Sequence, residues 1–226
     1  IKKFKKFEHK ISYLALKSSP NDIEVINSYD SDDIKESKII LNGYRRDNYQ
    51  REHIANLLKS AAPNDQIIIS DLDEIPNLEK VDFSSVRNKI ILFNQRMFYY
   101  KLNLVHETIN WYGSKSCKMK DLISPQWLRN IKDKKYPFWR IDTYFSKKKY
   151  NDIYFVKEGG WHFTKIKTPE EIHKTLKSYA HHLEYDQSKV GIKEIEKMIS
   201  EKKPYYDLTV DQTKDKTKSQ TKLKIV

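Results

Sequence analysis

Short apolar runs separated by turn-forming residues dominate the chain, and they predict a mixed α/β protein. The clearest run is 66–70 (QIIIS), in which three consecutive isoleucines lie between turn signals. Such a run is typical of a buried strand, and we expect it to be parallel to its neighbours. Similar runs predict strands over 10–16, 89–94, 97–101 and 153–156, and the second and third of these are close enough to form a hairpin.

Periodic apolar positions predict helices between these strands. Residues 47–62 carry their apolar side chains on one helical face and are followed at once by the 66–70 strand, which is half of a βαβ unit. A helix should begin at Pro169, because Thr168 can cap it and Glu171 can close a capping box. Another is predicted over 192–199. The pattern therefore favours an α/β fold with a mostly parallel central sheet.

Length and local composition predict one catalytic domain with a tail. We assign residues 1–206 to the domain, with a polar loop over 28–37 and an irregular segment over 111–136. Residues 207–226 are rich in Lys, Thr, Asp and Gln with little to bury, and predict a loosely attached basic tail. Because the chain begins at Ile1 rather than Met, we expect an N-terminal segment to be missing.

The chain is strongly basic, with 43 Lys and Arg against 31 Asp and Glu, a net charge of +12. Such a field attracts phosphorylated molecules, acidic lipids or nucleic acid, although its Lys, Asn and Ile bias is also typical of an AT-rich genome. Tyr99 and Tyr100 lie beside Lys101 without an RNA-recognition signature, so we expect no specific nucleic-acid partner. The tail could hold the protein on an anionic membrane. The lone Cys117 excludes an internal disulfide.

Residues 67–76 (IIISDLDEIP) carry the main chemical signal, because three acids directly follow a predicted buried strand. Ligands of open α/β sheets bind at the carboxyl ends of strands. Asp71 and Asp73 are two residues apart and can converge on one ion, and carboxylate oxygens suit Mg²⁺ or Mn²⁺. A solvated acidic turn would show the same Asp-x-Asp spacing, so the motif is weak when taken alone.

Two chemistries use such a strand end. In nucleotide-sugar transfer, a metal neutralises the diphosphate leaving group while an acceptor hydroxyl attacks the anomeric carbon. In a haloacid-dehalogenase-like phosphatase, Asp71 would itself be the nucleophile, but that family usually has Thr or Val two residues after the second Asp, where this chain has Ile75. A third hypothesis, from the charge alone, is a basic module that binds nucleic acid or a membrane surface.

Residues 158–163 (EGGWHF) form the second informative segment. Two glycines let the backbone turn sharply or approach a ligand. Trp161 could stack on a sugar ring, His162 could bind a metal or donate a hydrogen bond, and Glu158 could act as a general base. A strand turn with both aromatic residues in the core would give the same pattern.

Together the two segments resemble glycosyltransferase family 17, the family of the β-1,4-mannosyl-glycoprotein β-1,4-N-acetylglucosaminyltransferase. The similarity runs from about residue 7 to about residue 206. Its matching segments are 7–11 (FEHKI), 50–51 (QR), 67–76, 98–103 (FYYKLN), 159–163 and 178–181 (SYAH).

This resemblance implies a nucleotide-binding α/β sandwich of the type A glycosyltransferase fold. It implies an inverting transfer of N-acetylglucosamine from UDP-N-acetylglucosamine to a glycan, glycoprotein or glycolipid hydroxyl, with Mn²⁺ or Mg²⁺ as cofactor. The residues so implicated are Glu158 or Glu74 as the base, Arg51, Asp71, Trp161 and His162 for the donor, and Asp71, Asp73 and His162 for the metal. Glu74 could instead bind the metal or orient the donor.

Family members usually carry a further N-terminal stretch with the first strands of the nucleotide-binding sheet, and nothing in this chain matches it. We therefore expect those strands to be missing. Two kinds of compartment stay open. One is the cytoplasm or membrane periphery in a bacterium or virus-infected cell, and the other is the Golgi lumen in a eukaryote.

Overall fold

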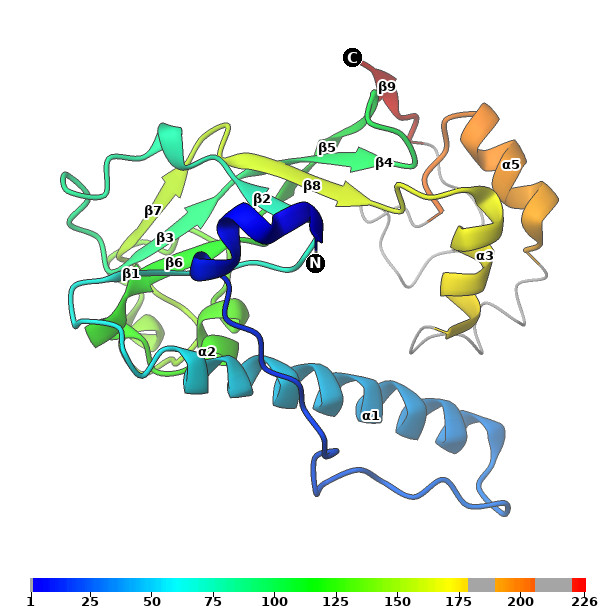
Figure 1. Cartoon of the computed structure of the whole chain (residues 1–226), viewed down its shortest axis with the longest axis horizontal. Coiled ribbons are helices and arrows are strands. Elements are labelled where there is room, and N and C mark those ends of the chain that lie inside the picture. The colour runs from blue at the N-terminus through cyan, green and yellow to red at the C-terminus, as the bar shows by residue number, and fades with distance from the viewer. Residues whose placement is uncertain (1, 179–189, 206–220) are drawn as a thin grey trace.

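A computed structural model describes residues 2–178, 190–205 and 221–226, whose strands form two sheets side by side (Figure 1). The first sheet contains, in spatial order, β1 (Gln66–Ile69), β6 (Lys115–Lys118), β3 (Ile90–Phe93) and β7 (Ile153–Val156). The second contains β2 (Glu74–Pro76), β8 (Gly160–Thr164), β4 (Gln95–Tyr99), β5 (Leu104–Trp111) and β9 (Lys224–Ile225). The expected α/β class is confirmed.

The expectation of a mostly parallel sheet is wrong. Among the described strands, β3–β7 and β4–β8 are parallel, whereas the pairs β1–β6, β3–β6, β2–β8, β4–β5 and β5–β9 are antiparallel. The predicted strand at 66–70 exists as β1, but its partner β6 runs antiparallel to it. A continuous apolar run reports that a strand is buried and carries no information about the direction of its neighbour.

The predicted hairpin between β3 and β4 is also wrong, because these strands belong to different sheets. Asn94 alone separates them, and its backbone bonds to the neighbouring segment: its N–H donates to Val156 at 3.0 Å and its carbonyl accepts from Gly159 at 2.7 Å. The segments β3–β4 and β7–β8 therefore run parallel to each other through both sheets. Their carboxyl ends, after Tyr99 and Thr164, reach the same edge of the second sheet.

The α-helices are α1 (Asp32–His53), α2 (Pro125–Asn130), α3 (Pro169–Ser178) and α5 (Ile192–Ser200). Two of them, α1 and α2, lie on one side of the sheets, and α3 and α5 lie beyond the ends of β4 and β8 (Figure 1). The 3-10 helices are η1 (Lys2–Lys10), η2 (Ile54–Leu57), η3 (Leu78–Lys80), η4 (Met119–Asp121) and η5 (Ile141–Thr143). In the part of the chain with assigned structure, no helix is long and apolar enough to cross a membrane.

Local capping chemistry decides where α1 and α3 begin. Thr168 and Glu171 form the predicted capping box of α3, with hydrogen bonds of 3.0 and 3.3 Å. Ser31 caps α1 by accepting from the Ile34 N–H at 3.4 Å, so the polar stretch predicted as a loop is helical from Asp32 onwards. Acidic residues here favour the positive end of the helix dipole. Residues 179–181 of the family resemblance lie outside the described part.

Both ends of the chain depart from the sequence expectations. Residues 11–16 form no strand and their apolar side chains are largely exposed, since no neighbouring strand offers them hydrogen bonds. In contrast, residues 221–226 are attached: β9 pairs with β5, and the side chain of Leu223 is only 3% exposed. Residues 207–220 of the predicted tail lie outside the described part, and the expectation of little to bury is wrong for its last residues.

The core has two main clusters, which fix the position of the site between them. One packs α3, α5 and Leu223 against the second sheet, around Met97 and Leu104. The other packs α2 against the first sheet, around Leu92 and Leu128. The acidic motif at 71–74 connects β1 to β2 and so passes from one sheet to the other.

Candidate functional site

The acidic turn is closed by its own backbone and side chains. The Glu74 N–H donates to the Asp71 carbonyl at 3.0 Å, and the Asp71 N–H donates to the Glu74 carboxylate, also at 3.0 Å. Leu72 between the two aspartates is fully exposed. The turn therefore directs Glu74 inwards and leaves Asp71 and Asp73 nearer the surface.

Glu74 is enclosed by an arginine and a tryptophan. The Arg129 guanidinium donates to its two oxygens at 2.9 and 2.8 Å, and the Trp111 indole N–H donates at 2.9 Å. Gly113 faces this carboxylate so closely that any side chain there would overlap it, and Arg129 also donates to the Gly113 carbonyl. The Glu74 side chain is 0% exposed, so it cannot reach a substrate hydroxyl. Glu74 anchors the turn, which corrects its assignment as a base.

Asp71 faces two arginines. Arg51 from α1 donates to one carboxylate oxygen at 3.2 Å, and Arg129 donates to the other at 2.5 Å. Arg51 therefore reaches the acidic motif, as the sequence suggested, and it also donates to Gln126 on α2 at 2.6 Å. Because both oxygens are directed at guanidinium groups, a metal at Asp71 would compete with Arg51 and Arg129. The metal assignment of Asp71 stays a prediction.

Asp73 meets His162, as expected from the pairing of the two sequence motifs. The strands β2 and β8 place Glu74 opposite His162, and the Phe163 N–H donates to the Asp73 carbonyl at 2.8 Å. The Asp73 carboxylate, which is 48% exposed, lies 3.4 Å from Nε2 of His162. The hydrogen bond from His162 lowers the pKa of Asp73 and keeps this carboxylate ionised.

Trp111 fixes the imidazole of His162. Their rings stack with centroids 4.5 Å apart and an angle of 13° between planes. The Nδ1 atom of His162 is buried and has no hydrogen-bond partner among the described residues. The imidazole is thus held between an indole and a carboxylate. Trp111 was not selected from the sequence, where nothing distinguishes it from a core aromatic residue.

Asp73 and His162 are two of the expected metal ligands, and the structure brings them together. Their 3.4 Å separation exceeds a charge-assisted hydrogen bond of about 2.8 Å, and it lets both atoms contact one ion at about 2.1 Å. The described residues contain no group of three or more metal-ligating side chains. A two-donor site suits Mg²⁺ or Mn²⁺, which usually takes its other ligands from phosphate oxygens and water.

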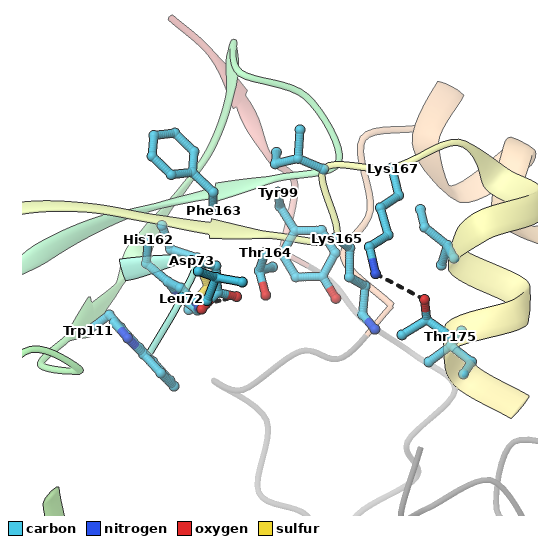
Figure 2. A pocket seen from close by; sticks show the side chains of 14 residues that line it. Leu72, Asp73, Tyr99, Trp111, His162, Phe163, Thr164, Lys165, Lys167 and Thr175 are labelled. Carbon is cyan, nitrogen blue, oxygen red and sulfur yellow. Dashed lines mark hydrogen bonds and ion pairs between the residues drawn. The ribbon is translucent and has the colours of Figure 1, made fainter. Parts of the chain in front are cut away.

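A cavity of about 610 Å³ opens beside this pair (Figure 2). It lies between the carboxyl ends of β4 and β8 and the helix α3, and it has mainly apolar walls with Lys165 and Lys167 among them. Parallel strand ends are a common position for ligand sites. The cavity lining comprises Leu72, Asp73, Met97, Tyr99, Trp111, His162, Phe163, Thr164, Lys165, Ile166, Lys167, Ile172, Thr175 and Leu176.

Two predicted residues do not join this site. Glu158 lies just before β8, at the end of that strand which is far from the cavity. Its side chain is 77% exposed and forms an ion pair with Lys80 at 2.8 Å, which lowers the pKa of Glu158. Trp161 is 38% exposed on β8, directly before His162. Neither Glu158 nor Trp161 lines the cavity. The structure thus places neither the expected base Glu158 nor the expected stacking residue Trp161 beside Asp73 in the cavity, and both roles stay predictions.

The site therefore combines an accessible carboxylate–imidazole pair, an aspartate held by two arginines, and an apolar cavity with two lysines. Such a combination can bind a metal, an anion and a ring-shaped ligand side by side. Comparison of the chain with known protein families, curated proteins and solved structures found no match.

Proposed function

We propose that the protein is an inverting, metal-dependent glycosyltransferase that uses a nucleotide-sugar donor. The observation that carries this proposal is the Asp73–His162 pair at the mouth of the cavity, on a turn fixed by Glu74 and Arg129. The family resemblance adds UDP-N-acetylglucosamine as the donor and a glycan hydroxyl as the acceptor. The position of the motif at the carboxyl end of β1 supports a type A glycosyltransferase fold.

Each residue then has a defined part. Asp73 and His162 would hold a Mn²⁺ or Mg²⁺ ion, which supplies positive charge for the diphosphate leaving group. Asp71 keeps Arg51 and Arg129 close to the same turn, and these side chains position the motif. The cavity receives a sugar and excludes water from it. Fixed charges at such a site need no rearrangement as the leaving group departs.

Calorimetric titration of UDP, with and without Mn²⁺, tests the proposal. The wild type should bind UDP in a metal-dependent manner, and Asp73→Asn should weaken that binding by at least about tenfold, the effect of one charge-assisted contact. Asp47→Asn is a matched control, because Asp47 is exposed on α1 away from the cavity. Metal-independent UDP binding that survives Asp73→Asn would disprove the proposal.

The phosphatase alternative requires a free oxygen on Asp71 to attack phosphorus. Both oxygens accept hydrogen bonds from arginines, which lowers their nucleophilicity and counts against this chemistry. Turnover of a generic phosphate ester with Mg²⁺, abolished by Asp71→Asn, would favour it over sugar transfer.

A second candidate, binding to an anionic membrane surface, has one specific observation in its favour. In the segment 136–145, large apolar side chains are exposed, including Trp139 at 68% and Phe145 at 84%, and lysines flank them on both sides. Aromatic and basic residues together suit a membrane interface. This segment is therefore a candidate membrane contact in addition to the basic tail, most of which lies outside the described residues.

Cosedimentation with phosphatidylcholine vesicles, with and without phosphatidylserine, tests this candidate. Wild type should bind the anionic vesicles, and the double variant Trp139→Ser, Phe145→Ser should not. Tyr29→Ser is the matched control, because Tyr29 is equally exposed but lies before α1. Equal binding of all three proteins would mean that the net charge of the protein, rather than the exposed aromatic segment, causes vesicle binding.

A further inference from the structure

The strands β4 and β8 end in the same unusual backbone conformation at the edge of the cavity. They pair in parallel through Tyr99 and Thr164, and the next residues, Tyr100 and Lys165, have φ angles of +64° and +53°. The Tyr100 N–H donates to the Thr164 carbonyl at 3.2 Å and holds the two ends together. A positive φ is unfavourable for residues with a side chain, and its occurrence at two paired strand ends beside one cavity makes this edge a candidate functional position.

Lys165 carries its ammonium group to the cavity, where it has no negative partner among the described residues. Lys165 makes no ion pair with a described acid, and its Nζ lies 5.6 Å from the centre of the Tyr205 ring. Burial, and then the charge of Lys167, lower the pKa of Lys165 to about 8. An unpaired, partly buried ammonium group is costly, and a bound anion would remove that cost.

Lys167 adds a second positive charge to the same wall. Its Nζ donates to the Thr175 hydroxyl at 3.1 Å, which is a neutral partner, and it too has no acidic partner among the described residues. Figure 2 shows both lysine side chains directed from the end of β8 towards α3. The acid that lines the cavity, Asp73, already pairs with His162. Within the described part of the chain, the α3 side of the cavity therefore carries two positive charges without a paired acid.

We propose that this cavity binds a ligand whose anionic group, a phosphate or a carboxylate, is held by Lys165 and Lys167. The rest of the ligand packs against the apolar wall formed by Met97, Ile172 and Leu176, which are buried. The inference rests on the proposed function, since the cavity opens at the same acidic turn. The anionic group belongs either to the diphosphate of the donor or to an acidic acceptor sugar.

Calorimetric titrations of Lys165→Gln, Lys165→Arg and Lys174→Gln test this inference. Lys174 is the matched control, because it is exposed on α3 and does not line the cavity. The probes are inorganic pyrophosphate, UDP with Mn²⁺, methyl β-D-glucuronide and its neutral analogue methyl β-D-glucoside. Lys165→Gln should weaken at least one anionic probe by about tenfold or more, whereas Lys165→Arg and Lys174→Gln should retain it.

The probe that responds identifies the source of the anion. Loss of UDP and pyrophosphate affinity assigns the lysines to the donor, and loss of glucuronide affinity assigns them to an acidic acceptor; both support the site. The inference is overturned if a folded Lys165→Gln variant binds every anionic probe as the wild type does. It is likewise overturned if wild type binds the glucoside as tightly as the glucuronide and ignores pyrophosphate and UDP.

The two proposals fail separately. If UDP binding responds to Asp73→Asn but no anionic probe responds to Lys165→Gln, the glycosyltransferase proposal stands and the anion site is wrong. If UDP binding is independent of both metal and Asp73 while pyrophosphate or glucuronide affinity depends on Lys165, the anion site stands and the glycosyltransferase proposal is wrong.

Discussion

Arg129 donates to both oxygens of the buried Glu74 carboxylate, at 2.9 and 2.8 Å, and so fixes the turn that carries Asp71 and Asp73. Arg129 comes from α2 under the first sheet, whereas Glu74 begins the second sheet. One ion pair thus joins the two sheets at the candidate site. Its energetic role can be measured apart from any activity.

Arg129→Met should destabilise the protein by about 3–5 kcal/mol, because it leaves the Glu74 charge buried without its partner. Urea unfolding followed by circular dichroism gives this value. Arg45→Met is the control, since Arg45 pairs with the solvent-exposed Asp22 and Glu24 and should contribute about 0–1 kcal/mol. Adding Glu74→Met to Arg129→Met should recover part of the loss; no recovery would mean that the buried charge is not its cause.

The lowered pKa of Lys115 predicts that the free energy of unfolding rises at alkaline pH. Its ammonium group donates to the backbone carbonyls of Arg129 and Ile131, and burial, followed by the charge of Arg129, lowers its pKa to about 8. An unfolded lysine titrates near about 10.4. Between these values the unfolded chain binds more protons, so the free energy of unfolding increases with pH.

The comparison with Lys115→Met isolates this effect, because all other titrating groups cancel. From pH 8 to pH 10 the stability of the wild type should increase relative to the variant by up to about 2 kcal/mol. Urea unfolding at several pH values measures the difference. A difference that shrinks with rising pH would show that folding favours the charged form of Lys115.

The burial of Leu223 indicates that the C-terminal strand β9 contributes to the stability of the core. Its side chain packs with Met97, Leu104 and Ile172, and β9 supplies the outer partner of β5. Leu223→Ala should cost about 2–4 kcal/mol of stability, through lost burial and a residual cavity. Val226→Ala, at an exposed position directly after β9, should have almost no effect. Equal stability of both variants would place the C-terminus outside the core.

Lys165→Gly should make the protein more stable while it removes anion binding. Glycine accepts a positive φ without strain and carries no ammonium group into the cavity, so a gain of about 1 kcal/mol is expected. Lys202→Gly is the matched control, since Lys202 has a φ of +58° at the end of α5 and does not line the cavity. It should gain stability and keep its affinity for the anionic probes. A destabilised Lys165→Gly would show that no strain is stored there.

The sequence by itself determined the local elements and the two chemical motifs. Three isoleucines in a row predicted β1, the pair Thr168 and Glu171 predicted the start of α3, and both are present. These features depend on the spacing of apolar side chains along the chain and on hydrogen bonds between residues that are close in sequence. The sequence also named Asp73 and His162 as candidate metal ligands, and the structure places them 3.4 Å apart.

Only the tertiary structure decided which partners these elements have. It set most strand pairs antiparallel, sent β3 and β4 into different sheets, and attached residues 221–226 to β5. It also placed Arg129 and Trp111 around Glu74 and left Glu158 on the surface. Pairing direction and long-range ion pairs depend on which surfaces meet after the chain collapses, and a local pattern of apolar and polar residues does not encode that choice.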